Sequence, residues 1–307
     1  MRSARGSLRV RSRNQSRQKT SHRLDAPAEG KGENGMSLSL ITNIGSLQAS
    51  NALTNNQTAL NQSIAQLSSG KRIVSASDDP GGLSIAIETQ GLLGALNQAS
   101  QNASNAQSFL QTADGALSNI GNLLQTAQQL ATEASDGSYN STQLTSIDSQ
   151  YQAILTSINQ IANGSSFNGI SLFTGTAVTF QVGATNTAND QLSVTINKAD
   201  TTTLAINGTS LTSQANAQAA LTKVTSALAT IAGDRATVGS SEQSLTAVSS
   251  NLQSTEQNLT AALSSIQDAN VAQTYAQFTK ESVLQQAGVQ VLRQADQTPS
   301  QLVALFQ

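Results

Sequence analysis

The stretch LLGALNQASQNASNAQSFLQTADGALSNIGNLLQTAQQLATEA, residues 92–134, decides the fold. Its apolar residues recur in alternating steps of four and three over about six heptads, which is the spacing of a coiled-coil seam. They are Leu92, Leu96, Ala99, Ala103, Ala106, Leu110, Ala113, Leu117, Ile120, Leu124, Ala127, Ala131 and Ala134. We expect one helix from near Pro80 to Ser135, on the order of 80 Å long at about 1.5 Å per residue. A compact domain does not need such a rod.

The start of this rod is marked by Asp78, Asp79 and Pro80. A carboxylate caps the free N–H groups of a first turn, and proline loses no hydrogen bond there. Two adjacent carboxylates could also serve acid/base or Mg²⁺ chemistry, but helix capping is the favoured interpretation. We read Gly81 and Gly82 as backbone freedom at the helix start.

Helical spacing recurs on both sides of the rod. A shorter helix ends at Gly70, and a third helix follows the rod and closes at Asn163 and Gly164. A long return helix runs from Ala217 to Ala269, and a last helix starts at Val271 and ends before Pro299. The seam of the third helix is predicted to consist of Leu144, Ile147, Tyr151, Ile154, Ile158 and Ile161.

Between residues 167 and 206 the period changes from helical to alternating, as in half-buried strands. Val178, Phe180 and Val182 form one such run, and a second run spans residues 192–196. About three short strands are expected. The predicted fold is therefore mainly α, with elongated antiparallel helical rods in a coiled coil and a small β-hairpin region at the tip where the helical arms converge.

The composition argues against several classes of function. Charged residues make up 11% and aromatic residues 3%, there is no cysteine, and His22 is the single histidine. Without cysteine or a second histidine we expect no metal centre, and the sequence contains no glycine-rich phosphate loop. We therefore predict no catalytic residue, no cofactor and no enzyme activity. No apolar run approaches the roughly 18 residues of a membrane span, and no cleaved secretory leader is recognisable.

Residues 1–35 differ in charge from the rest of the chain. They hold nine basic and three acidic residues, whereas the remainder is acidic and the whole chain has a net charge of -2. A nucleic-acid tail or a transit peptide would be basic, but the segment lacks an apolar stripe and the body offers no second basic surface. A start codon assigned upstream of the true one is the favoured interpretation, with Met36 as the natural start. We expect no nucleic acid and no membrane among the partners.

Motifs in both halves of the chain resemble those of bacterial flagellin, the subunit of the flagellar filament. The N-terminal half contains MSLSLITN from Met36, LSSGKRI from Leu67 and DDPGG from Asp78, and it continues with SFNGISLF from Ser166. The C-terminal half contains LQQAG from Leu284 and ADQTP from Ala295. The resemblance covers about residues 36–196 and 217–307, with only about 20 residues between them. It therefore implies a short flagellin without large outer domains.

The resemblance implies a division into segments and a set of assembly residues. The segments are a basic extension (1–35), an N-terminal core arm (36–78), rod helices (79–166), a β tip (167–212), a C-terminal rod helix (213–265) and a C-terminal core arm (266–307). The two arms are expected to pair in the filament's inner core through Leu53, Leu60, Ile64, Leu67, Leu284, Ala287, Val291 and Leu292. The family motif residues are Asp78, Asp79, Phe167, Asn168 and Gly169.

The implied function is that of a structural subunit that assembles with copies of itself for motility. A thin rod cannot bury every apolar stripe internally, and contacts between different faces of identical subunits produce an open helical filament. An ordinary antiparallel bundle with all apolar residues inside is the alternative on physical grounds. A hook-filament junction protein and a surface adhesin on the same scaffold are the alternative functions. Implied partners are an export chaperone and the hook-associated and cap proteins, and the implied location is the extracellular flagellum, reached by the flagellar secretion route.

One stretch departs from the flagellins that the animal Toll-like receptor senses. Those flagellins carry two arginines and a glutamate in the motif LQRVREL, whereas residues 124–130 here read LQTAQQL. The altered receptor-contact positions are Gln128 and Gln129, next to Leu130, and Leu155 and Thr156 occupy the place of an acidic pair on the next helix. The resemblance thus predicts weak recognition by the receptor.

Overall fold

The computed structural model describes residues 43–305, so the basic extension predicted at residues 1–35 lies outside the described part. The described residues fall into two compact units. The larger unit spans Ala52–Val289, and the smaller one consists of residues 43–51 and 290–305. In the smaller unit the amide of Asn43 donates to the carbonyl oxygen of Ala295 at 2.8 Å, and the hydroxyl of Ser46 donates to the carboxylate of Asp296 at 2.6 Å.

Helices dominate the described residues. The helices are α1 (Ile44–Ser69), α2 (Pro80–Ala134), α3 (Ser141–Gly164), α4 (Gln214–Gln267) and α5 (Val271–Leu305), with a short 3-10 turn at Ala188–Asp190. The strands are β1 (Ser166–Phe167), β2 (Ile170–Ser171), β3 (Ala177–Gln181) and β4 (Gln191–Thr195). The predicted mainly α fold with antiparallel helices and small β-hairpins is confirmed.

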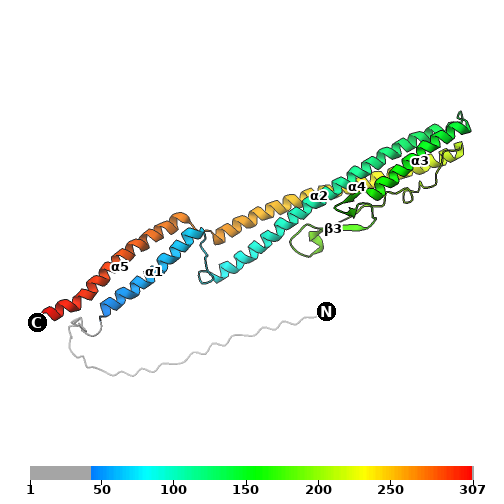
Figure 1. The fold of residues 1–307 in the computed structure, drawn as a ribbon. Coiled ribbons are helices and arrows are strands. Elements are labelled where there is room, and N and C mark those ends of the chain that lie inside the picture. Colours follow the sequence, from blue (N-terminus) through cyan, green and yellow to red (C-terminus); the bar gives the residue numbers. More distant parts are fainter. Residues whose placement is uncertain (1–42, 306–307) are drawn as a thin grey trace, which may run out of the picture. The chain divides into compact units, whose positions relative to one another are not determined.

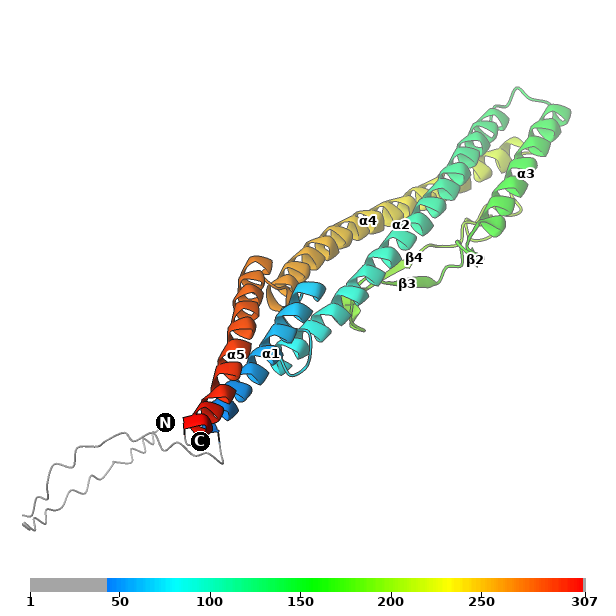
Figure 2. The same cartoon turned by 60° about the vertical axis from the view of Figure 1, so that its left-hand side comes forward.

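The coiled-coil seam of α2 is the core of the larger unit. Every predicted seam residue from Leu96 to Ala134 is buried, whereas Leu92 is 38% exposed. The antiparallel partner is α4, which lies beside α2 in both views (Figure 1, Figure 2). Arg235 of α4 forms a bidentate ion pair with Asp114 of α2, in which its Nε and Nη2 donate to the two carboxylate oxygens at 2.8 and 3.1 Å.

Helix α3 packs against the far half of α2 and completes a three-helix section. Asn140 and Gln143 form a reciprocal capping box at its start. The buried residues of α3 include Leu155, Ile158 and Ala162, while Ile154 and Ile161 are only partly buried. Leu155 and Ala162 thus take the buried places predicted for Ile154 and Ile161, whereas Ile158 is buried as predicted. The segment that follows β4 also covers α3, since the side chain of Asn159 accepts from the N–H of Thr201 and the amide of Gln152 donates to the carbonyl oxygen of Thr209, at 2.9 and 2.8 Å. A wider face of α3 is therefore covered than a two-stranded seam requires.

The two β-hairpins lie against the middle of α2 rather than at the end of the rods. The ring of Phe109, halfway along α2, makes edge contacts with Phe167 at 5.8 Å and with Phe180 at 5.5 Å. The reason is the length of α3, whose 24 residues run back along α2 and return the chain to the level of Phe109. The hairpins thus extend the core sideways.

Four strands form two separate antiparallel pairs, where about three strands were expected. Strand β1 pairs with β2, and β3 pairs with β4 with Val178 opposite Val194. Helix α5 also differs from expectation, because it continues through Pro299 to Leu305. Among residues 43–305, no helix is both long enough and apolar enough to cross a membrane.

Candidate assembly site

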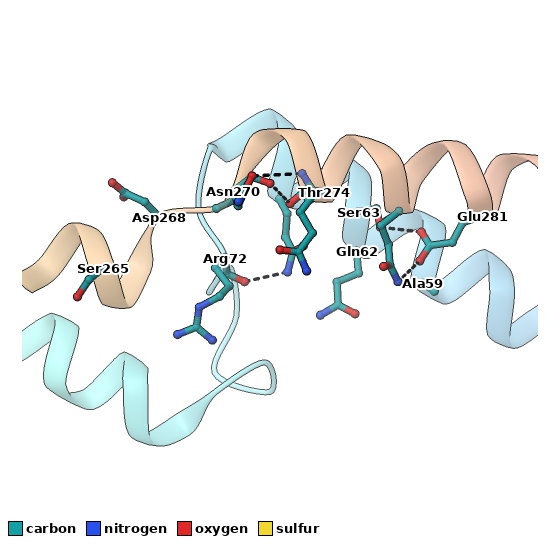
Figure 3. A pocket seen from close by; sticks show the side chains of 13 residues that line it. Ala59, Gln62, Ser63, Arg72, Ser265, Asp268, Asn270, Thr274 and Glu281 are labelled. Carbon is teal, nitrogen blue, oxygen red and sulfur yellow. Dashed lines mark hydrogen bonds between the residues drawn. The ribbon is translucent and has the colours of Figure 1, made fainter.

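Within the larger unit, the two connections at the base of the rods are joined to each other. The N–H of Arg72 donates to the carbonyl oxygen of Gln267 at 2.7 Å, and the N–H of Ala269 donates to the carbonyl oxygen of Gly70 at 2.9 Å. Lys71 and Asp268 thereby face each other as an antiparallel bridge. Gly70 has a φ of +68°, which glycine adopts without strain and which turns the chain out of α1. The segments that link α1 to α2 and α4 to α5 therefore form one junction (Figure 3).

The two adjacent aspartates have separate structural tasks in this junction. Asp79 caps α2, because its carboxylate accepts from the N–H of Gly82 at 2.8 Å, so the predicted cap is confirmed. Asp78 instead orders the preceding loop by accepting from the N–H groups of Val74 and Ser75 at 2.9 and 2.8 Å. These backbone hydrogen bonds hold the pKa of Asp78 below its ordinary value.

Gly82 is needed for close packing. A Cβ at this position would lie 2.8 Å from Cγ of Asp79 and 2.8 Å from Cδ1 of Ile73. Both neighbours are held, since Asp79 caps the helix and Ile73 is buried. The interpretation of Gly82 as a source of backbone freedom is therefore replaced by a steric one.

A polar groove of about 430 Å³ opens beside the junction (Figure 3). Arg72 lies at one end, where its guanidinium donates to the carbonyl oxygen of Ile266 at 2.7 Å and lies 3.6 Å from the carboxylate of Asp79. Glu281 lies at the other end and is only 4% exposed. Its carboxylate accepts from the hydroxyl of Ser63 at 2.6 Å and from the amide of Gln277 at 3.0 Å. The groove thus exposes amide and hydroxyl groups and encloses one carboxylate.

Beyond the groove, α1 and α5 run antiparallel and contact each other mainly through polar side chains. The amide of Asn56 donates to the carbonyl oxygen of Glu281 at 2.8 Å and to the side chain of Gln285 at 3.2 Å. Gln285 in turn donates to Gln57 at 2.6 Å. The helices approach each other closely at Gly288, where a Cβ would lie 3.1 Å from Cδ1 of Leu53. The N-terminal and C-terminal segments of the larger unit are thus paired.

Known proteins resemble both the N-terminal and the C-terminal helical segments in sequence. The sequence matches the bacterial flagellin N-terminal helical region over residues 40–178 and the bacterial flagellin C-terminal helical region over residues 221–306. Flagellin of Listeria monocytogenes is 31% identical over 281 residues, which cover 86% of this chain and 98% of the relative. Flagellin of Bacillus subtilis is 32% identical over 301 residues, with the same 86% and 98% covered.

The chain belongs to the bacterial flagellin family. It is a structural subunit of the flagellar filament, which assembles from copies of the subunit outside the cell and serves motility. Since it spans 98% of two flagellins of similar length, it is a short form. The crystal structure of Bacillus cereus flagellin is 32% identical, covers 53% of this chain and 94% of that chain, and has a TM-score of 0.44.

In this flagellin the residues predicted for the inner core lie in two different environments. Leu53, Leu60 and Leu67 are half-buried on α1, and so is Leu292 of α5, which belongs to the smaller unit. The other predicted residues are exposed on the helix surfaces and lie outside the seam of the pair; they are Ile64, Leu284, Ala287 and Val291. The prediction selected apolar residues only, whereas the seam between α1 and α5 also includes polar residues.

Ser63 and Glu281 are the residues that the sequence analysis missed. A signal for them exists, because Leu53, Asn56, Leu60, Ser63 and Leu67 follow one another in steps of three and four. A strict heptad count therefore places Ser63 in the seam of α1 and excludes Ile64.

The remaining motif residues lie along the rods and the first hairpin. Asn168 and Gly169 form the two-residue turn between β1 and β2, with φ angles of +48° and +79°.

On α2, the half-buried side chain of Gln128 donates to the hydroxyl of Thr225 at 3.3 Å. Gln129 is exposed, and Leu130 packs against the core. Leu155 is 5% exposed and belongs to the interior of the three-helix section.

Proposed function

We propose that the pair formed by α1 and α5 is the part of this flagellin that joins subunits in the inner core of the filament. The observation that carries the proposal is the exposure of large apolar side chains on this pair. Tyr275 is 61% exposed, Val283 59%, Leu284 48% and Ile64 46%. Each fully buried side chain of this size contributes about 1.5–3 kcal/mol, so neighbouring copies that cover them stabilise a polymer.

The free subunit lacks these neighbours. A narrow pair of helices with a polar seam buries too little apolar area to offset backbone ordering at about 1–2 kcal/mol per residue. We therefore expect the two arms to be largely disordered before assembly and to become helical in the filament.

Truncation tests this proposal. Deleting residues 36–70 or residues 285–307 should leave a soluble protein whose rod helices remain folded by circular dichroism but which does not polymerise. The double variant Leu284→Ser, Val291→Ser should raise the critical concentration for assembly. Gln286→Ser, at an exposed polar position on α5, is the control. Filaments of normal length and yield from either truncation would refute the proposal.

The same exposed residues support a role for α5 in export. Val283, Leu284 and Val291 are 59%, 48% and 58% exposed and would be accessible in a lone subunit. We expect an export chaperone to cover them inside the cell, the N-terminal arm to be the export address, and the hook-associated and cap proteins to contact the filament ends through the same helices. Co-purification of a chaperone with the full chain but not with the 285–307 deletion is the expected result. A secreted protein shortened by a signal peptidase would contradict this route.

A further inference from the structure

The seam between α1 and α5 contains a polar layer among small and apolar residues. On α1 the seam positions are Leu53, Asn56, Leu60, Ser63 and Leu67, and all of them are half-buried or buried. Ser63 is the most covered of them, with 4% exposure. Apolar residues at such positions favour pairing but tolerate more than one alignment, whereas a buried polar group is satisfied in one alignment only.

The partner stripe on α5 is even more polar. Phe278, Glu281, Gln285 and Gly288 follow one another in steps of three and four, and Glu281 is the one that is fully buried. Within residues 43–305, no lysine or arginine forms an ion pair with Glu281. The side-chain hydrogen bonds of its carboxylate come from Ser63 on the opposite helix and Gln277 on its own helix. Ser63 is therefore the donor that ties Glu281 to α1.

A slip of the pair by one helical turn would remove this donor. Because the helices run antiparallel, a slip in one direction brings Leu60 to the level of Glu281 and a slip in the other direction brings Leu67 there. Either leucine would cover the carboxylate without donating a hydrogen bond, and a buried charge that loses its donor is costly. The contacts at Asn56 and Gln57 would be lost in the same movement.

We propose that Glu281, acting through Ser63, is the positioning residue that fixes the register of α1 against α5. The proposal rests on the proposed role of this pair in the inner core. Its consequence for assembly is that every subunit presents Ile64 and Leu284 to its neighbours at the same level along the pair. A polymer of identical contacts needs this uniformity, because a slipped subunit would place its exposed apolar residues one turn away.

Cysteine crosslinking can read the register directly, because the chain contains no cysteine. Gln57→Cys with Gln285→Cys reports the alignment seen in the structure, in which these two side chains bond. Asn61→Cys or Leu53→Cys with Gln285→Cys reports a slip of one turn in either direction. Each double-cysteine subunit is diluted into an excess of unmodified protein and assembled. The filaments are treated with a short bismaleimide and analysed by mass spectrometry for crosslinks within one chain.

The decisive variant is Ser63→Ala, Glu281→Leu, which replaces the polar layer with an apolar one. We expect the pair to form but to lose its unique alignment, so that slipped crosslinks become comparable in yield to the aligned one. Glu281→Gln keeps an acceptor for Ser63 and should retain the aligned crosslink alone. Glu88→Leu, at an exposed position on α2, controls for the added leucine. A single aligned crosslink in the double variant would overturn the proposal.

Ser63→Ala alone provides a second measurement should the double variant fail to assemble. Loss of a hydrogen bond to a charged group should raise the critical concentration on the order of 10-fold and produce slipped crosslinks in the filaments that form. Unchanged assembly with the aligned crosslink alone would also overturn the proposal. Failure of the proposed function looks different, since the truncated chains would then polymerise whatever the crosslinks show.

Discussion

At the scale of single residues, the junction depends on side chains whose space or charge is already used by a neighbour. Gly82 lies where the Asp79 carboxylate and the buried Ile73 leave no room for a Cβ. Asp78 accepts hydrogen bonds from two backbone N–H groups of the loop before α2. In the segment DDPGG the two aspartates thus perform different tasks, and the second glycine occupies a place with no room for a Cβ.

Gly82→Ala should destabilise the junction. The added methyl group would overlap Asp79 and Ile73, and overpacking of this kind costs about 1–3 kcal/mol. Gly81→Ala is the matched control, because its Cβ would lie 3.7 Å from Asp79, an ordinary contact. Urea unfolding of the two variants measures the difference. Equal stability of both would show that the loop adjusts freely.

Acid should weaken the hydrogen bonds by which Asp78 orders the loop before α2. Hydrogen bonds from Ser75 and Val74 lower the pKa of Asp78 below its ordinary value of 3.8. A carboxyl group whose pKa is lowered on folding stabilises the fold fully above its ordinary pKa, and this contribution is lost as the pH falls through the lowered value. Amide hydrogen exchange at Val74 and Ser75 should therefore lose protection below about pH 3.8. In Asp78→Asn, which does not titrate, this pH dependence should disappear.

At the scale of elements, the hairpins are held by α2 more than by each other. Strands β1 and β2 have two residues each, and β3 and β4 have five, which is too little for independent stability. Phe109 contacts an aromatic ring from each hairpin, and the amide of Asn102 donates to the carbonyl oxygen of Gln181 at 3.1 Å. Helix α2 thus provides the surface on which both hairpins fold.

Phe109→Ala should release the hairpins while the rods remain helical. Removing a buried phenylalanine costs about 3–5 kcal/mol, and Phe109 is 3% exposed. Limited proteolysis is expected to cleave the variant between residues 166 and 196 at low protease concentration, with far-UV circular dichroism nearly unchanged. Tyr275→Ala, at a 61% exposed aromatic position on α5, is the control and should resist cleavage there. A hairpin region as resistant in Phe109→Ala as in the control would contradict this view.

At the scale of the whole molecule, two of the residues that differ from receptor-sensed flagellins take part in the rod's own packing. Gln128 bonds to Thr225 of α4, and Leu155 lies in the interior of the three-helix section. Neither residue offers the charged groups that the motif LQRVREL of the receptor-sensed flagellins carries. We therefore expect this surface to provide the receptor with few strong contacts.

Receptor signalling by this flagellin should be weaker by orders of magnitude than signalling by flagellins with the charged motif. An arginine in an interface offers a fork of donors and can contribute a few kcal/mol, which glutamine cannot reproduce. The variant Gln128→Arg, Gln129→Glu should gain activity in a reporter-cell dose response with the unmodified protein alongside. Strong activation by the unmodified protein at low concentration would show that the apolar residues around Leu124 and Leu130 suffice.

The features that follow from the amino-acid sequence alone are local in the chain. The heptad spacing of residues 96–134, the Asp79 cap and the hairpin alternation each specify an element, and the motifs of both halves point to flagellin. Which face of each element is covered depends on the three-dimensional fold: Glu281 is buried against Ser63, Leu284 is exposed, and the hairpins lie beside Phe109. The reason is physical, because periodicity arises within one helix, whereas burial depends on where a partner distant in sequence ends and on how it aligns.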